Sequence, residues 1–321
     1  MAKFLDIIIP EYDCNIEYVR ALLNSINIQK GIDFSEIGII YVNDKSSKLL
    51  DDGIFKEYPN LDITYLKRDI NGGQSAARQT GLDYSRAAYV TFIDQDDILY
   101  KDLALAPVIN NLKKENVDAV FTSFIRDFPS LKRSELLTIK ELTCLHGLFI
   151  NREFLIKNNI KFHPNIRMYE DLYFCELIMN IADVRIFDYP TYIWIFRETC
   201  QTAIYNTGSQ CIIKKIDDYV VAVTDMIEFL RNKNKLNQVT FLRYLFTLII
   251  LLESDLFKNI DITKYENLVY KMYLNNIDLY NSISNDHKDF AYNATKNSAV
   301  KTYKINRINY NYKSFLKKME K

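Results

Sequence analysis

The 321-residue chain is short of the residues that build flexible linkers, zinc sites and disulfide frameworks. Eight glycines and six prolines are too few for long linkers, and the three histidines are too dispersed for a histidine metal triad. The cysteines form no CxxC pair, which argues against a zinc site and favours a reducing compartment. They are Cys14, Cys144, Cys175, Cys200 and Cys211.

An excess of one charge and a long apolar run are also missing. The 41 basic residues balance the 41 acidic ones, so nothing draws the whole chain to nucleic acid. The most apolar stretch, residues 244–252, is far shorter than the roughly 20 residues that cross a bilayer, and it predicts a buried helix. The first residues turn acidic too early for a signal peptide. We expect a soluble, cytoplasmic protein.

Apolar runs alternate with amphipathic segments over residues 1–125. The runs predict strands at 4–9, 36–42, 62–66, 88–93 and 118–124. Helices are predicted at 16–29, 49–58 and 102–116, and a glycine-rich loop opens another helix within 71–85. This alternation predicts an α/β fold with a doubly wound, mostly parallel sheet.

The alternation loosens after residue 125. The sequence predicts helices at 152–158 and 171–182 and strands at 184–189 and 191–196. From about residue 210 onwards the pattern is mainly helical. We therefore predict two domains, 1–209 and 210–321.

Polar clusters follow four of the predicted strands. They occupy residues 10–13, 43–44, 71–73 and 94–97. The carboxyl ends of parallel strands meet at one edge of a sheet, where ligands bind. A solvated turn explains any single cluster, but four together favour a binding site at that edge.

Two of the clusters suggest a specific chemistry. Asp94 and Asp96 are two residues apart, so in an extended segment both carboxylates point to one side and suit Mg²⁺ or Mn²⁺ shared with substrate phosphates. The loop that starts at Asn71 matches neither the P-loop nor the dinucleotide fingerprint. Its glycines allow close backbone approach, and Arg78 either reaches a diphosphate or is a surface residue of an amphipathic helix.

The ordered motifs resemble family 2 glycosyltransferases, which have the GT-A fold. The resemblance covers residues 4–205 and rests on IIIPEYD, VND, NGGQSAARQTG, TFIDQDD, HGLFINREFL, KFHPNIRMYEDLYF and YIWIFRETC. It implies a nucleotide-binding and catalytic domain followed by a helical domain for acceptor, membrane or oligomer contact. Two segments depart from the family: Thr199-Cys200 replaces the usual Ser, and His146-Gly147-Leu148 lacks the usual Lys.

The resemblance implies a role for each matched position. Pro10, Tyr12 and Asp44 would hold uracil or its ribose, Asp96 with Asp94 would bind the divalent cation, and Asp171 would be the catalytic base beside Glu170. The full set implied to bind the nucleotide-sugar is Pro10, Tyr12, Asp44, Asn71, Gly73, Arg78, Asp94, Gln95, Asp96 and Arg197. The alternative for Glu170 and Asp171 is a helix N-terminus, where acidic residues are favoured.

We therefore expect an inverting, metal-dependent enzyme that moves a sugar from a UDP-sugar to a hydroxyl of a glycan, teichoic-acid-like or lipid-linked acceptor. The alternative is a non-catalytic binding module of the same fold in a glycan-assembly complex. A nucleotidyltransferase is disfavoured because the loop at 10–13 is acidic.

Three features of the rest of the chain leave alternatives open. Residues 296–321 hold eight basic residues and one acidic residue, and form either a surface for the inner face of a membrane or a solvated helical face. The apolar stripes between 212 and 256 indicate core or homo-oligomer contact. Trp194 is either a core residue or a stacking platform for the acceptor.

Overall fold

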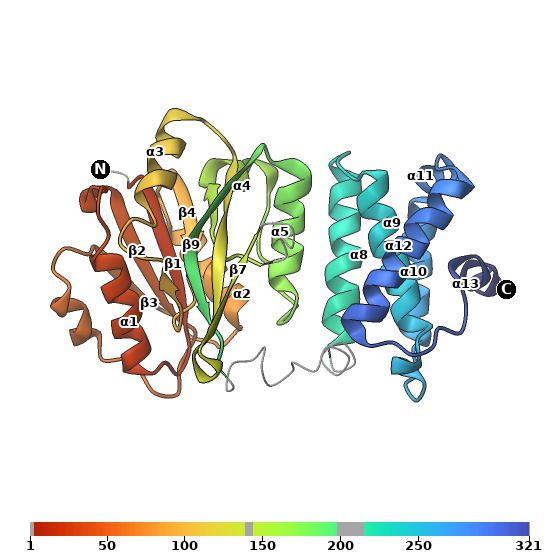
Figure 1. Ribbon diagram of the computed structural model, residues 1–321, viewed down its shortest axis with the longest axis horizontal. Coiled ribbons are helices and arrows are strands. Elements are labelled where there is room, and N and C mark those ends of the chain that lie inside the picture. Colours follow the sequence, from red (N-terminus) through yellow and green to blue (C-terminus); the bar gives the residue numbers. More distant parts are fainter. Residues whose placement is uncertain (1–2, 139–143, 198–214, 321) are drawn as a thin grey trace. The chain divides into compact units, whose positions relative to one another are not determined.

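The computed structural model describes residues 3–138, 144–197 and 215–320 (Figure 1). The chain divides into two units, Met1–Cys200 and Gln201–Lys321. The predicted domain boundary between residues 209 and 210 lies outside the described residues, so it stays a prediction.

Parallel strands form one half of the sheet in the first unit. They are β1 (Leu5–Glu11), β2 (Ile37–Asn43), β3 (Ile63–Lys67) and β4 (Tyr89–Phe92). Every residue of β1, β2 and β4 is buried, which explains why their sequences are continuous apolar runs. Pro10 was predicted to close the first strand, but it lies inside β1. The pairing of β1 with β4 ends at Ile8. The missing N–H of Pro10 therefore costs no hydrogen bond to β4.

The other half of the sheet mixes parallel and antiparallel strands. It contains β5 (Ile98–Leu99), β6 (Ala119–Phe128), β7 (Arg133–Leu137), β8 (Leu148–Asn151) and β9 (Val184–Ile195). Among the described residues the strand order is β3-β2-β1-β4-β8-β6-β9-β5, and β7 pairs with β6. The two strands predicted at 184–189 and 191–196 form the single strand β9, whose register with β6 shifts around Ser123.

Helices cover both faces of this sheet, as the doubly wound prediction requires (Figure 1). They are α1 (Ile16–Asn27), α2 (Gln74–Tyr84), α3 (Ala106–Lys114), α4 (Arg152–Asn158) and α5 (Glu170–Ile181), with the 3-10 helices η1 (Phe34–Glu36), η2 (Asp52–Glu57) and η3 (Pro129–Leu131). Alternation along β1 turns Leu5, Ile7 and Ile9 towards α1 and α3, and Ile8 towards α2. The predicted α/β class is confirmed; the helix predicted at 49–58 is only a short 3-10 helix.

The second unit is helical, as predicted. Its described elements are α8 (Ile216–Asn232), α9 (Gln238–Leu252), η5 (Asp255–Phe257), α10 (Thr263–Asn275), α11 (Ile277–Asn281), α12 (Asn285–Tyr303) and α13 (Tyr312–Met319). The apolar stretch 244–252 lies in α9 and is largely buried, which confirms the prediction of a buried helix. Lys318 ties α13 to two buried carboxylates, Glu266 at 2.6 Å and Glu253 at 3.5 Å. None of the helices in the described part of the chain has the length and hydrophobicity that a membrane span requires.

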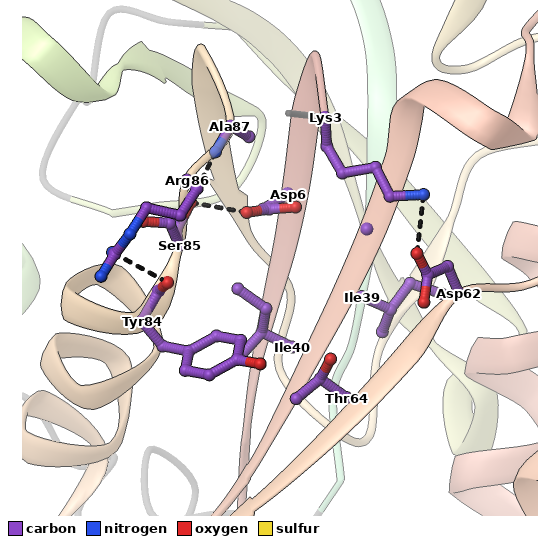
Figure 2. A pocket seen from close by; sticks show the side chains of 11 residues that line it. Lys3, Asp6, Ile39, Ile40, Asp62, Thr64, Tyr84, Ser85, Arg86 and Ala87 are labelled. Atoms are coloured by element: carbon purple, nitrogen blue, oxygen red, sulfur yellow. Dashed lines mark hydrogen bonds and ion pairs between the residues drawn. The ribbon is translucent and has the colours of Figure 1, made fainter. Parts of the chain in front are cut away.

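A crevice of about 380 Å³ opens beside the amino ends of β1 and β2 (Figure 2). Asp6 is 5% exposed there and accepts a hydrogen bond of 2.6 Å from Ser85 Oγ, which fastens the end of α2 to β1. Lys3 Nζ pairs with Asp62 at 2.7 Å on one side of the crevice. Ligands of open α/β sheets bind at the carboxyl ends of the strands, so this crevice lies at the end opposite to the predicted site.

The close approach of α2 to the sheet depends on Gly81. A Cβ atom at this position would lie 2.4 Å from Ile8 Cγ2 and 3.3 Å from Val42 Cγ2. Both neighbours are fully buried side chains of the central strands. The absence of a side chain therefore sets how near α2, and every residue on it, lies to β1 and β2.

We predict that Gly81→Ala destabilises the first unit by about 1–3 kcal/mol, because overpacking against Ile8 outweighs the better helix propensity of alanine. Urea unfolding of the full chain measures this. Asp83→Ala, at an exposed position of the same helix, should change the free energy of unfolding by less than about 0.5 kcal/mol. A neutral or stabilising Gly81→Ala would show that α2 has room to move away from the sheet.

Candidate functional site

The structure brings most of the predicted site residues to the carboxyl ends of β1, β2 and β4. The loop after β4 carries Asp94, Gln95 and Asp96, and the amino end of α2 supplies Arg78. Asp171 lies in the first turn of α5. Elements that are far apart in the sequence therefore place these side chains within one region.

A buried guanidinium lies at the centre of this region. Arg78 is 2% exposed, and its Nη2 donates to Asp94 Oδ1 at 2.7 Å. Its Nη1 donates to Asp171 Oδ1 at 2.8 Å and faces Glu170 Oε1 at 3.4 Å. One side chain thus joins the loop after β4 to the start of α5. Arg78 was predicted to line the nucleotide pocket, and a contact with nucleotide stays a prediction.

Three carboxylates around one cation cannot all be equally acidic. Burial opposes the charge of Arg78, but Asp94, Asp171 and Glu170 together raise its pKa above the ordinary value. Burial acts to raise the pKa of Asp94, yet the adjacent Arg78 holds it below the usual range. Burial and the Asp171 charge raise the pKa of Glu170 to about 8. Glu170 therefore keeps a proton near neutral pH, while Asp94 stays ionised.

Asp96 has a different partner. Its carboxylate pairs with Arg197 Nη1 at 3.0 Å, and the Arg197 guanidinium carbon lies 4.1 Å from the centre of the Tyr18 ring. Burial and the nearby Asp94 raise the pKa of Asp96, and Arg197 opposes this rise. Arg197 therefore closes the side of the acidic loop nearest to α1.

Asp97 anchors the loop to β9. Tyr192 Oη donates to Asp97 Oδ2 at 2.6 Å, and the Ile195 N–H donates to Oδ1 at 2.8 Å. The backbone N–H of Asp94 in turn donates to Tyr192 Oη at 3.2 Å. Burial and the two neighbouring aspartates raise the pKa of Asp97 well above its usual range. The third carboxylate of the FIDQDD segment therefore holds the loop against β9.

His146 belongs to this region, which the sequence analysis missed. Single ligand atoms of Asp94, Asp97 and His146 lie within 4.8 Å of one another. Burial lowers the pKa of His146 to about 4, so its imidazole is neutral, and Nδ1 is buried without a hydrogen-bond partner among the described residues. Two carboxylates and a neutral imidazole fit a divalent cation. The predicted ligand pair Asp94 and Asp96 is therefore joined by a second candidate set.

The register of the sheet explains why His146 lies there. β4 and β8 are antiparallel and pair Thr91 with Phe149. Continuing that register by three residues brings His146 opposite Asp94. Sequence reasoning would have found His146 if it had recognised β8 as the partner of β4.

Asp44 fixes the glycine-rich loop. Its carboxylate accepts hydrogen bonds from the N–H groups of Gly72 at 3.0 Å and Gly73 at 2.6 Å, and it pairs with Arg68. Asn71 Nδ2 donates to the Asp44 carbonyl at 3.0 Å. Gly73 has a φ of +83°, which favours glycine. Asp44 and Asn71 therefore shape the loop before α2, and their predicted contact with uridine stays a prediction.

Gln95 links the loops after β1 and β4. Its side-chain amide donates to the Tyr12 carbonyl at 3.0 Å and accepts from the Tyr12 N–H at 2.9 Å. Tyr12 is 48% exposed, while Pro10 is buried in β1. The backbone of Tyr12 is therefore held against the loop after β4, and its predicted contact with uridine stays a prediction.

Two curated relatives each match more than half of the chain. Glycosyltransferase GlyA of Streptococcus pneumoniae is 31% identical over 181 residues, which cover 56% of this chain and 23% of GlyA. Poly(ribitol-phosphate) beta-N-acetylglucosaminyltransferase TarP of Staphylococcus aureus is 27% identical over 212 residues, which cover 60% of this chain and 62% of TarP. The chain thus spans less than a quarter of GlyA and less than two thirds of TarP.

The fold has a solved counterpart. The crystal structure of residues 1–349 of TarS from S. aureus in complex with UDP-GlcNAc has a TM-score of 0.67 and 15% identity, and covers 100% of this chain and 92% of that one. Independently, residues 6–176 match glycosyl transferase family 2. Because that match spans more than half of the chain, the protein belongs to glycosyl transferase family 2.

Proposed function

We propose that this chain is an inverting, metal-dependent glycosyltransferase that moves a sugar from a UDP-sugar to an acceptor hydroxyl. The observation that carries this proposal is the bridge made by Arg78 between Asp94 and Asp171. Donor binding and proton removal require an acidic cation site and a carboxylate base a short distance apart. Arg78 bonds to Asp94, the candidate cation ligand, and to Asp171, the candidate base, and so limits the distance between the two carboxylates.

The residues fit a divalent cation in two overlapping ways. Asp94 and Asp96 are the pair implied by the family resemblance, and Asp94, Asp97 and His146 form the compact group in the structure. When bound, Mn²⁺ or Mg²⁺ would neutralise the departing diphosphate. A donor set that includes an imidazole suits Mn²⁺ better than Mg²⁺, which prefers oxygen ligands.

Asp171 is the better candidate for the base than Glu170. Glu170 is 8% exposed and holds its proton up to about pH 8, whereas Asp171 bonds to the Arg78 cation and its side chain is 25% exposed. Burial raises the pKa of Asp171, and Arg78 limits the rise. A partly exposed carboxylate with a raised pKa is suited to accept the proton of an attacking hydroxyl. Attack by that hydroxyl in a single displacement would invert the anomeric centre.

The relatives suggest the class of substrates. TarS was solved with UDP-GlcNAc, and TarP is named for transfer of N-acetylglucosamine to poly(ribitol-phosphate). We propose a UDP-linked hexose or N-acetylhexosamine as donor and a cell-envelope glycan or teichoic-acid-like chain as acceptor. The expected cytoplasmic location, with contact at the inner membrane face, and the expected homo-oligomer stay predictions.

Asp171→Asn should lower acceptor-dependent UDP release by about 10²–10⁴, because asparagine keeps the shape of the side chain but cannot take a proton. The affinity for UDP with Mn²⁺, measured by calorimetry, should change little. Glu153→Gln alters an exposed first-turn acid of α4 and should leave turnover unchanged. Near-normal turnover of Asp171→Asn would reduce Asp171 to a helix-terminal acid, and the base would then be Glu170 or another residue.

Glu170 should make the stability of the first unit depend on pH. Its pKa rises from 4.5 to about 8 on folding, so its contribution to stability is fully present below pH 4.5 and is lost as pH rises through about 8. The loss amounts to at most about 1.4 kcal/mol per pH unit in that window.

Glu170→Gln should flatten this dependence, since glutamine cannot ionise. Urea unfolding at pH 5, 6, 7 and 8 measures it, and Glu17→Gln, in the first turn of α1, is the matched control. Parallel stability curves for the wild type and Glu170→Gln would show that Glu170 is ionised in the folded protein.

A further inference from the structure

The ribbon formed by β6, β7 and β9 extends beyond the carboxyl end of β4 (Figure 1). Residues 119–121 of β6 are level with β8 and β4, and the strand then continues to Phe128. Side chains alternate along a strand, so Phe124, Arg126 and Phe128 lie on one face of β6. The register sets Arg126 beside Trp194 of β9 and Glu135 of β7.

Rings and guanidinium groups stack along this face. His146 stacks on Trp194 with a centroid distance of 5.5 Å and an interplanar angle of 26°. The Arg126 guanidinium carbon lies 4.9 Å from the Trp194 ring centre and 6.0 Å from that of Phe128. Arg133 continues the stack at 4.8 Å from Phe128. The face, called here the arginine–aromatic face, comprises Trp194, Arg126, Phe128, Arg133 and Phe196.

This face begins at the acidic loop. His146, whose ring stacks on Trp194, is one of the three candidate metal ligands together with Asp94 and Asp97. Tyr192, two residues before Trp194 on β9, donates to Asp97 at 2.6 Å. The arginine–aromatic face therefore leads outward from the proposed transfer site over a continuous series of contacts.

Arg126 has N–H donors that are not used in hydrogen bonds to the described residues. Within the described part of the chain its ionic partner is Glu135, with Arg126 Nη1 and Glu135 Oε2 3.9 Å apart, and Glu135 Oε1 pairs with Arg133 Nη2 at 3.0 Å. Arg126 Nε is buried and has no hydrogen-bond partner among the described residues. The side chain is 31% exposed, so part of it is open to solvent. A planar guanidinium between two rings is well placed to bind a phosphate group with two hydrogen bonds.

We propose that the arginine–aromatic face binds the acceptor as a chain of polyol or sugar units joined by phosphodiester groups. The exposed parts of the rings would contact the C–H surfaces of the units, and Arg126 would hold a phosphodiester beside them. This proposal rests on the proposed function, because the hydroxyl that follows the bound phosphodiester must reach Asp171.

Trp194 is the only tryptophan of the chain, so its fluorescence reports directly on this face. The full chain is titrated with a short glycerol phosphate oligomer, and with a neutral maltooligosaccharide of equal length. We expect a saturable change in fluorescence with the phosphate oligomer and a much weaker response to the neutral one. Arg126→Met should weaken oligomer binding by about 10- to 100-fold, the usual effect of losing a charged hydrogen bond.

Calorimetry with UDP and Mn²⁺ on the same proteins separates the two proposals. Arg126→Met should keep the wild-type affinity for UDP within about twofold, since Arg126 bonds to none of the proposed donor residues. Arg185→Met, at an exposed position near the start of β9, is the matched control and should bind both ligands normally. If Arg126→Met does not fold, Arg126→Lys keeps the charge and should bind the oligomer less tightly than the wild type.

Three results would overturn the proposal while leaving the proposed function intact. In the first, UDP binds normally but the oligomer leaves Trp194 fluorescence unchanged. In the others, Arg126 variants bind the oligomer like the wild type, or the neutral oligosaccharide binds as tightly as the phosphate oligomer. The reverse result, oligomer binding without any UDP binding by the wild type, would support the arginine–aromatic face and count against the proposed function.

Discussion

The arrangement of the site depends on one buried cation. Arg78 is almost fully enclosed, and removing a guanidinium from water is costly unless carboxylates surround it. Asp94, Asp171 and Glu170 supply that environment from the loop after β4 and from the start of α5. The same requirement ties these segments together, so the acidic loop and the candidate base cannot move apart without exposing an unpaired charge.

The sheet sets the remaining geometry. The antiparallel β8 between β4 and β6 brings His146 to the acidic loop, and the extension of β6 beyond β4 carries Arg126 and Trp194 outward from it. Asp97 and Tyr192 join the loop to β9. Strand pairing and the Tyr192–Asp97 hydrogen bond thus position the candidate metal ligands and the face proposed to bind the acceptor.

The sequence predicted the parallel half of the sheet because its buried strands are continuous apolar runs separated by clear turn residues. β8 was missed because its four residues run directly into α4, without a turn to mark the strand. His146 was missed for the same reason, since only the pairing of β8 with β4 brings it to Asp94. Helical spacing likewise left open whether Arg78 reaches a diphosphate or lies on the surface, and did not reveal that it is buried, because burial of a cation depends on partners from other segments. Asp94, Asp96 and Asp97 were found as a cluster, but their separate partners could not be read from spacing.

The most direct test of this account is the turnover of Arg78→Lys, which keeps the positive charge but replaces two directed donor groups with a single ammonium. The account predicts a folded protein whose acceptor-dependent release of UDP is reduced by about 10²-fold, since displacements of about 1 Å between reacting groups have effects of that size. Circular dichroism establishes that the variant is folded. Wild-type turnover in a folded Arg78→Lys protein would show that the two-sided bridge between Asp94 and Asp171 does not organise the site.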